Sequence, residues 1–490
     1  MVFPVVGGTQ DTGAYEIDNS LRFNDGDSAR LTLDPGTSTN NKKCTLSFWA
    51  KIGVPTSNGT DYFFSNHADA NNRCRVHISN TGEFAIFGKS SGSTFIDLYT
   101  NARYRDSSAW YHFLVRVDST DGTANNRLKL YVNGTLQTDV TQGTNPDQNA
   151  DVILGSQDNM TIGAGHSGSA ANSNPYDGYL AEMHFLDGTA YDASYFGEFN
   201  DNGVWIPKKY TGGNYGTNGF YMEFKQTGTS ANSSGIGADT SGNDNHFAVS
   251  NLAATDVTTD TPTNNFATLN PLDQSNSYAQ NDATRGTFSE GNCNFSSAGQ
   301  IGGFERYYNT TATIAIPSSG KWYWEAKPNN GTNGLGFRWV MGLLASNHGY
   351  SNANFTEWTE AQGQRGAYKA DGTVWYNNNQ ISSGHGTPSV NDIISFKYDA
   401  DNRDFFVAVN GTYINSGNAV LTSSNITATD FLLIFLQNGS DGDVATAMNF
   451  GNAPFSISSG NADANGHGNF EYAVPSGYFA LCTKNLAEYG

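Results

Sequence analysis

The chain of 490 residues has few cysteines, few basic residues and no long apolar segment. Its cysteines are Cys44, Cys74, Cys293 and Cys482. No two of them form a Cys-x-x-Cys pair, so we expect four small buried hydrophobic residues and neither a disulfide framework nor a cysteine-ligated metal. Lys and Arg number 26 against 46 Asp and Glu, which gives a formal net charge of −20. This charge argues against nucleic acid as a partner, because affinity for it depends on Lys and Arg contacts to phosphate.

Signals for membrane insertion and export are also missing. No segment approaches the roughly 20 apolar residues that cross a bilayer. The opening residues, MVFPVVGG, lack the positively charged region of a signal peptide. We therefore expect a protein that is made in a cytoplasm without a signal peptide and that does not bind a membrane.

Turn-forming residues, by contrast, are abundant. The chain has 55 Gly and 13% aromatic residues, and Asn, Ser, Thr and Asp fill the connections between short alternating segments. No long segment repeats its apolar residues with the period of a helix. This pattern predicts an all-β protein with many short antiparallel strands, as in a β-sandwich.

Two stretches far apart in the chain are near copies of each other. Residues 127–138 read RLKLYVNGTLQT and residues 403–414 read RDFFVAVNGTYI, and each predicts a strand that turns at Asn-Gly in a type I′ hairpin. A Trp-containing strand precedes each hairpin. Trp49 lies 84 positions before the first Asn-Gly, and Trp324 lies 86 positions before the second. The matched spacing predicts two sandwiches of one architecture in tandem.

The first half carries an ordered set of motifs: SLRF at 20–23, LSFWA at 46–50, WYHF at 110–113, LYVNG at 130–134 and YDGYLAEMHF at 176–185. Together they resemble a laminin-G-like domain of the concanavalin A type over residues 20 to about 200. The resemblance implies a jelly-roll sandwich whose rim loops often bind sugar, sometimes through calcium.

The second half carries another set: KWYWE at 321–325, VMGLL at 340–344, GAYKADG at 366–372, DIISFKYD at 392–399 and MNFG at 448–451. In this order they resemble a SPRY domain, which implies a second antiparallel jelly-roll sandwich that acts as an interaction module. The expected domains are an N-terminal arm at 1–18, a laminin-G-like sandwich at 19–204, a connector at 205–262 with strands packing on the first domain, and a SPRY sandwich at 263–490.

The pairing of these two domains, the apolar arm and the ending PSGYFALCTKNL at 475–486 resemble virion surface proteins of tailed bacteriophages. The resemblance implies a multi-copy or homo-oligomeric protein at the virion surface, either a head decoration or a tail-associated adhesin. Its partners would be capsid or tail proteins, reached through the arm, and host-surface or environmental glycans. The alternative is a purely structural virion protein whose arm binds neighbouring subunits.

Catalytic motifs are missing. Laminarinase-like enzymes of this fold carry Glu-x-Asp-x-x-Glu or Glu-x-Asp-x-Glu, which holds two carboxylates about 5 to 5.5 Å apart. Glu16 and Asp18 approach the motif but lack the second Glu, and Glu182 and Glu325 each stand alone on a strand. There is no Gly-x-Ser-x-Gly, His-Glu-x-x-His or phosphate-binding loop either. We expect no enzyme, and a polysaccharide depolymerase is the disfavoured alternative.

Sugar binding needs exposed aromatic rings beside polar groups. Aromatic residues near predicted loops or strand ends are Trp358, Trp375, Tyr376, Tyr307 and Tyr308. Calcium is the one cofactor that the turns allow, because their carboxylates are hard oxygen ligands. The candidate ligands are Asp25, Asp27, Asp118, Asp121, Asp239 and Asp244. The competing interpretation is that Asp fills turns because its side chain bonds the nearby backbone, and it accounts for most of them.

Overall fold

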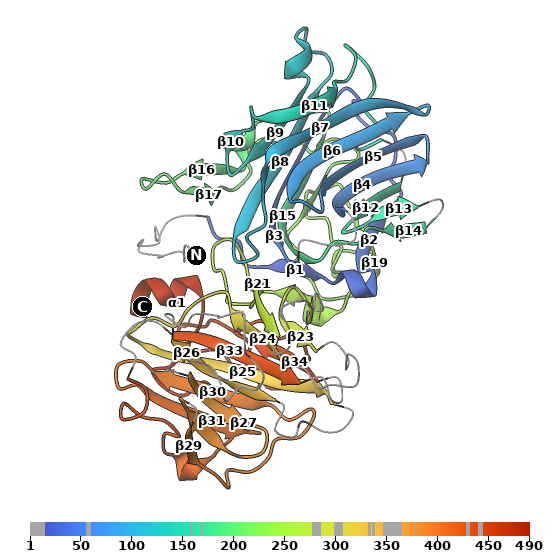
Figure 1. Ribbon diagram of the computed structural model, residues 1–490. Helices are drawn as coiled ribbons and strands as arrows, with labels where there is room; N and C mark the ends of the chain where they lie inside the picture. The colour runs from blue at the N-terminus through green and yellow to red at the C-terminus, as the bar shows by residue number, and fades with distance from the viewer. Residues whose placement is uncertain are drawn as a thin grey trace. The chain divides into compact units, whose positions relative to one another are not determined.

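The computed structural model describes residues 15–54, 60–156, 159–167, 170–276, 286–297, 307–331, 335, 339–345, 365–377, 379–427, 432–439 and 444–490. The chain divides into two compact units, and the boundary falls between Thr263 and Asn264. Each unit is built on two large, mainly antiparallel sheets (Figure 1), so the predicted all-β fold with two sandwiches is confirmed. The described residues contain one α-helix, α1 (Thr483–Tyr489). None of their helices is long and apolar enough to cross a membrane.

The first sandwich has two eight-stranded sheets, sheet A and sheet B. Sheet A runs β10 (Thr135–Leu136), β9 (Leu128–Val132), β8 (Trp110–Asp118), β3 (Lys43–Ile52), β15 (Gly178–Asp187), β1 (Ser20–Phe23) and β20 (Val257–Thr258), with β18 (Phe220–Met222) also paired to β15. Sheet B runs β11 (Val140–Thr144), β7 (Ser93–Arg103), β6 (Glu83–Ser90), β5 (Asn72–Ile78), β4 (Asp61–Asp69), β12 (Asn159–Ile162), β2 (Arg30–Leu33) and β19 (Ala248–Ser250). Two hairpins, β13 (Gly165–Ser167) with β14 (Ala170–Ser173) and β16 (Gly197–Phe199) with β17 (Trp205–Pro207), form separate pairs. Short 3₁₀ turns are η1 (Asp25–Asp27), η2 (Ala124–Asn126), η3 (Ala193–Tyr195) and η4 (Ala254–Asp256).

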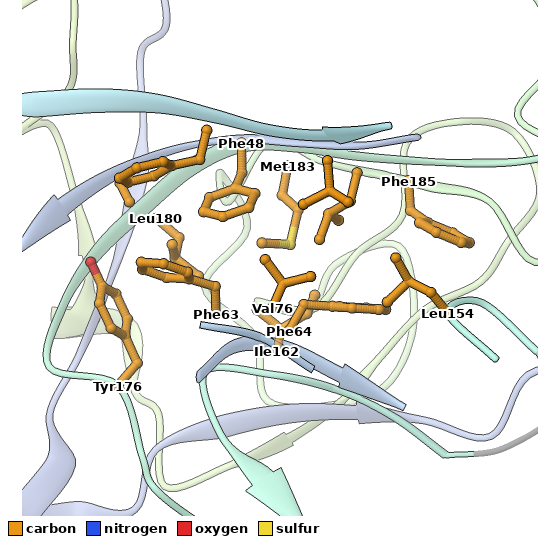
Figure 2. Close-up of a cluster of buried hydrophobic side chains, with 14 of the residues drawn as sticks. Phe48, Phe63, Phe64, Val76, Leu154, Ile162, Tyr176, Leu180, Met183 and Phe185 are labelled. Carbon is orange, nitrogen blue, oxygen red and sulfur yellow. The ribbon is translucent and has the colours of Figure 1, made fainter. Parts of the chain in front are cut away.

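The core of this sandwich is rich in phenylalanine. Figure 2 shows Phe48 from sheet A meeting Phe63 from sheet B, and their ring centroids lie 5.0 Å apart. Phe84 and Phe113 close the cluster, with centroids 4.4 Å apart. All four side chains are fully buried. The alternation of apolar residues along each strand therefore places one face of each sheet in a shared core.

Strand β15 departs from simple alternation. The pairing of β15 with β3 shifts between Ala181 and His184, and Glu182 has φ of +47°. Strict alternation after Leu180 would turn Glu182 and His184 into the core. The bulge adds one residue, so Met183 and Phe185 enter the core instead (Figure 2). Glu182 and His184 consequently lie on the outer face of sheet A, the face turned away from sheet B.

A second apolar layer covers this outer face. Leu114 and Leu186 of sheet A pack with Ala193, Phe196 and Tyr215 from the chain that follows β15. At the other end, Ile17 packs on Trp49 and Ala181. The residues from Tyr15 onward thus lie against the sandwich, whereas residues 1–14 of the expected arm fall outside the described residues. The expected connector contributes β18 and β20 to sheet A and β19 to sheet B.

The second sandwich also pairs two sheets. Its seven-stranded sheet runs β21 (Leu269–Asn276), β24 (Tyr307–Ala312), β33 (Leu432–Gly439), β26 (Val340–Ala345), β27 (Arg365–Lys369), β28 (Val374–Tyr376) and β29 (Asn379–Ser382). Its eight-stranded sheet runs β22 (Thr287–Ser289), β23 (Asn294–Ser296), β34 (Ala445–Asn449), β25 (Lys321–Asn330), β30 (Ile394–Asp399), β31 (Asp404–Val409) and β32 (Thr412–Tyr413), with β35 (Phe479–Ala480) parallel to β25. A 3₁₀ turn, η7 (Asn415–Gly417), follows β32. The stacked rings of Trp324, Phe396 and Phe405 lie in its core, with centroids 5.6 to 6.1 Å apart.

The two predicted Asn-Gly hairpins have the same geometry. Asn133 and Gly134 have φ of 46° and 74°, and Asn410 and Gly411 have 48° and 78°. Positive φ at both central residues defines the type I′ turn, so this prediction is confirmed. In each hairpin the Asn side-chain oxygen also accepts a backbone N–H from the neighbouring strand region, at 2.8 Å for Asn133 and 3.0 Å for Asn410.

A buried carboxylate holds the last part of the chain to the second sandwich. Glu325 is fully buried. It accepts hydrogen bonds from the Tyr323 hydroxyl at 2.9 Å and the Asn449 amide at 3.0 Å. It also accepts the backbone N–H groups of Glu471 at 3.0 Å and Tyr472 at 2.9 Å. Four donors therefore converge on one side chain.

This arrangement predicts the effect of Glu325→Ala. The change leaves buried donors without an acceptor, so we expect a loss of about 3 kcal/mol or more in the stability of the second sandwich. Hydrogen exchange of the β25 and β34 amides measures it. Glu488→Ala, at an exposed position of the same sandwich, is the control. Equal protection of β25 in the two variants would contradict the role of Glu325.

Candidate functional site

A cavity of 510 Å³ opens at the β15 bulge of the first sandwich. We call it the tyrosine pocket, because its walls include Tyr15, Tyr210, Tyr215 and Tyr221. The four tyrosines come from the segment before β1, the loop after β17 and strand β18, which the tertiary structure brings together. Polar side chains from the same segments and from the turn after β18 complete the lining.

The floor of the pocket is a hydrogen-bonded network around Glu182. This residue is buried, with only 8% of its surface exposed. Its Oε1 accepts the hydroxyl of Tyr15 at 2.8 Å and that of Tyr221 at 2.6 Å. Its Oε2 lies 3.2 Å from Nε2 of His184, which donates to it. The carboxylate is thus held in place by three donors although its backbone has positive φ.

Burial and hydrogen bonding act in opposite directions on Glu182. Burial raises the pKa of its carboxyl, but the hydrogen bond and charge of His184 lower it. The two tyrosine hydroxyls lower it further, and the resulting pKa lies below the ordinary value. Burial and the nearby Glu182 charge raise the pKa of both Tyr15 and Tyr221. At neutral pH the floor therefore holds an ionised carboxylate beside two protonated phenols.

The imidazole of His184 links this network to a third tyrosine. Its Nδ1 lies 2.9 Å from the Tyr215 hydroxyl. Its ring stacks on Tyr221, with centroids 4.3 Å apart and planes 8° apart.

Burial, followed by the charges of nearby tyrosines, raises the pKa of Tyr210 to about 12. The aromatic walls are therefore uncharged at neutral pH.

One turn after β18 shapes the rim. The Asp239 carboxylate accepts the backbone N–H of Tyr221 at 2.9 Å, Ser241 at 2.8 Å and Asn245 at 3.0 Å. It also accepts the Ser241 hydroxyl at 2.9 Å. These bonds fold the turn and place Thr240 and Ser241 in the pocket lining. The Asp239 side chain thus stabilises this turn.

Charged side chains of both signs surround the opening. Lys209, Lys225, Asp18 and Glu223 line the pocket. No ion pair to either lysine occurs within the residues that the structure describes. The rim can therefore contact polar groups of either sign on a ligand.

The other aspartates expected in calcium sites lie in separate turns of the first sandwich. Asp25 and Asp27 are exposed in η1, and Asp27 accepts the side-chain amide of Asn24 at 3.0 Å. Asp118 pairs with Lys43 at 3.2 Å. These contacts fit the competing interpretation, in which Asp stabilises the local turn.

The remaining candidates behave similarly. Asp121 accepts the backbone N–H of Thr123 at 2.8 Å. The Asp244 carboxylate lies 3.7 Å from Nε2 of His246. In the described part of the chain no group of three or more His, Cys, Asp or Glu side chains is arranged to hold a metal. Calcium binding stays a prediction.

Those of the expected sugar-binding aromatic residues that the structure describes belong to the second sandwich and not to the tyrosine pocket. Trp358 lies outside the described residues, and Tyr307 begins β24. Tyr308 is only 1% exposed, so its ring cannot serve as a surface platform.

Trp375 and Tyr376 are half-buried neighbours on β28. The Trp375 indole N–H donates to the Thr373 hydroxyl at 2.8 Å, and Lys369 Nζ lies 5.4 Å from its ring. The Tyr376 hydroxyl accepts the backbone N–H of Thr427 at 3.4 Å. Because successive strand residues point to opposite faces, the two rings do not form one platform.

The sequence does not reveal the tyrosine pocket, because its residues lie far apart along the chain; Tyr15 and Tyr221, for example, are separated by 206 positions. One local signal was present. The otherwise apolar strand from Gly178 to Asp187 contains Glu182 and His184 two positions apart. A pair of polar residues inside an apolar strand indicates either a bulge or a buried polar network.

A second buried histidine lies near this network. His112 on β8 accepts the Trp205 indole N–H at Nδ1, at 3.1 Å, and its Nε2 lies 2.8 Å from the Ser47 hydroxyl. Burial, reinforced by the charge of His184, lowers the pKa of His112 to about 3. His112 is therefore neutral and ties the β16–β17 hairpin to sheet A. Gly134 on the adjoining hairpin has no side chain, and this leaves room for the Trp205 ring.

Comparison with known proteins agrees with the predicted first sandwich. Residues 25–193 match the family model of the concanavalin A-like lectin/glucanases superfamily. No curated protein matches the chain. Similar solved structures include a heptameric SAP-like pentraxin from Limulus polyphemus, at 16% identity and a TM-score of 0.28, over 36% of this chain and 80% of that one. The SPRY domain of human HERC1 is similar at 12% identity and a TM-score of 0.26, over 37% and 96%. The CBM40 of a Ruminococcus gnavus IT-sialidase, bound to α2,3-sialyllactose, is similar at 17% identity and a TM-score of 0.25, over 31% and 80%.

The depressed pKa of His112 predicts a pH-dependent stability of the first sandwich. An unfolded histidine binds a proton below about pH 6.5, whereas folded His112 stays neutral down to about pH 3. Between these values the unfolded state binds more protons, so stability falls as the pH falls, by up to about 1.4 kcal/mol per pH unit for one group. His77, whose pKa burial also lowers to about 3, adds to the slope.

Thermal unfolding between about pH 7 and pH 4 measures this effect. We expect a smaller slope for His112→Gln than for the unchanged chain. His385→Gln, in the second sandwich, is the matched control and should leave the slope unchanged. An unaltered slope in His112→Gln would refute the prediction.

Proposed function

We propose that the protein binds glycans without catalysis and that the tyrosine pocket is its binding site. The observation that carries this proposal is a 510 Å³ cavity in which four tyrosines meet a fixed carboxylate. Sugar rings stack on aromatic side chains while their hydroxyls bond to polar groups. The match of residues 25–193 to a lectin and glucanase superfamily supports the same class of ligand.

The state of Glu182 favours binding over hydrolysis. Retaining glycosidases of this architecture use two carboxylates about 5 to 5.5 Å apart. The acid partner needs a raised pKa, whereas the pKa of Glu182 is lowered. Both of its oxygens already accept hydrogen bonds, and β15 carries no second glutamate. These features suit a carboxylate that positions a ligand.

We further propose that the protein is displayed in many copies on a bacteriophage virion, as a head decoration or a tail-associated adhesin. The support is the sequence resemblance of the arm, the domain pairing and the C-terminal segment to such proteins. Capsid or tail proteins would then be its partners. Mass spectrometry and immunogold labelling of purified particles test this placement, and its absence from particles whose lysate contains the protein would refute it.

We expect variants that block or widen the tyrosine pocket to lose glycan binding. Thr211 is an exposed lining residue, so Thr211→Trp fills the opening without disturbing the floor. Tyr210→Ala removes a wall, and truncation of a tyrosine at a binding site typically costs about 1 to 2 kcal/mol, or about 5- to 30-fold in affinity. A panel of surface glycans, with calcium and with a chelator, provides the measurement.

The matched controls lie on β7 of the opposite sheet. Thr94→Trp and Tyr99→Ala change exposed residues of the same types and should leave binding unchanged. Saturable binding that both pocket variants weaken supports the proposal. Binding that survives Thr211→Trp, or no glycan binding by folded protein, contradicts it. Loss of binding with the chelator would identify calcium as a required ion.

A further inference from the structure

At the floor of the pocket, two tyrosine hydroxyls donate their protons to Glu182. A phenol has a single proton to donate. Tyr15 and Tyr221 both give theirs to Oε1 of Glu182, at 2.8 and 2.6 Å. The two hydroxyl oxygens lie 3.2 Å apart. Each therefore faces the pocket with lone pairs only.

Glu182 and His184 complete the floor. The carboxylate of Glu182 is ionised and has no proton. Nε2 of His184 lies 3.2 Å from Glu182 Oε2 and donates to it, and Nδ1 lies 2.9 Å from the Tyr215 hydroxyl. Burial and the Glu182 charge keep the pKa of Tyr15 and Tyr221 above the ordinary value. The protons of Tyr15 and Tyr221 thus stay with Glu182, and these three side chains present acceptors but no donors to a ligand.

We propose that the tyrosine pocket selects glycans with a free amino group, whose ammonium donates to Tyr15, Tyr221 and Glu182. This inference rests on the proposed function and adds the class of sugar. An ammonium has three donors and no acceptor, which complements a floor of acceptors. Its positive charge is also attracted by Glu182 and by the faces of the tyrosine rings.

The same floor disfavours other ligands. A carboxylate, sulfate or phosphate group finds no donor on Tyr15, Tyr221 or Glu182, and a buried acceptor without a donor lowers affinity. The donors open to such a group are Lys209 and Lys225, which also line the pocket. The net charge of −20 also repels anionic glycans. A sugar hydroxyl donates only one proton and carries no charge, so we expect unmodified sugars to bind more weakly than amino sugars. N-acetylation removes the charge and enlarges the group.

Calorimetry with the full-length protein and three matched oligosaccharides tests the inference. The ligands are β-1,4-linked oligomers of glucosamine, N-acetylglucosamine and glucose of one length, at mildly acidic pH where the amine is protonated. We expect the glucosamine oligomer to bind at least about tenfold more tightly than the other two, equivalent to about 1.4 kcal/mol. An oligogalacturonate should bind more weakly than the glucosamine oligomer.

Glu182→Gln tests whether the preference needs a floor of acceptors, because the glutamine amide brings two N–H donors and no charge. We expect it to abolish the preference for the amine. Glu198→Gln, at an exposed carboxylate of β16 outside the pocket, is the matched control and should retain the preference. If Glu182→Gln lowers the unfolding temperature, Tyr15→Phe and Tyr221→Phe, which keep the rings, each remove one acceptor and should reduce the preference about threefold or more.

The outcomes separate this inference from the proposed function. If glycans bind and Thr211→Trp weakens them, but the amino sugar is not preferred, the inference is wrong and the proposed function stands. A preference for oligogalacturonate would overturn the inference in the same way. If folded protein binds no glycan, both are wrong.

Discussion

The β-bulge at Glu182 is the constraint on which the first sandwich depends. A strand that alternated strictly through this point would bury a carboxylate and an imidazole among phenylalanine rings, at a cost of several kcal/mol for each unpaired group. One extra residue at φ of +47° avoids this. It places Met183 and Phe185 in the core and leaves Glu182 and His184 on the outer face of sheet A. The core and the tyrosine pocket are thus two consequences of one local distortion.

The outer face of sheet A is covered because it carries large apolar and aromatic side chains, among them Trp49, Leu114 and Leu186. Lys51 and Asp260 form a buried ion pair of 2.8 Å, and the Trp110 indole N–H donates to the same aspartate at 3.1 Å. A buried ion pair is tolerated only when such additional bonds satisfy it. His112 fixes the β16–β17 hairpin in the same manner. Polar contacts therefore position the covering segments, and the pocket lies where the cover is incomplete.

The two sandwiches use a buried glutamate differently. Glu325 accepts four donors, two of them backbone N–H groups, and so stabilises the end of the chain. Glu182 accepts two phenols and an imidazole whose side chains also line a cavity. A carboxylate bound by backbone groups serves the fold. A carboxylate bound by side chains at a cavity wall can also act on a ligand, because those side chains contact both.

The sequence by itself determined the strands, the two Asn-Gly hairpins and the division into two sandwiches. These depend on local periodicity, on turn residues that accept positive φ and on a spacing repeated along the chain. The tandem all-β architecture followed from them. Only the tertiary structure decided the site, because Tyr15, Glu182 and Tyr221 come together through sheet pairing and no local pattern encodes that pairing. The same reason explains Tyr308, whose exposure depends on neighbouring strands that its own segment does not specify.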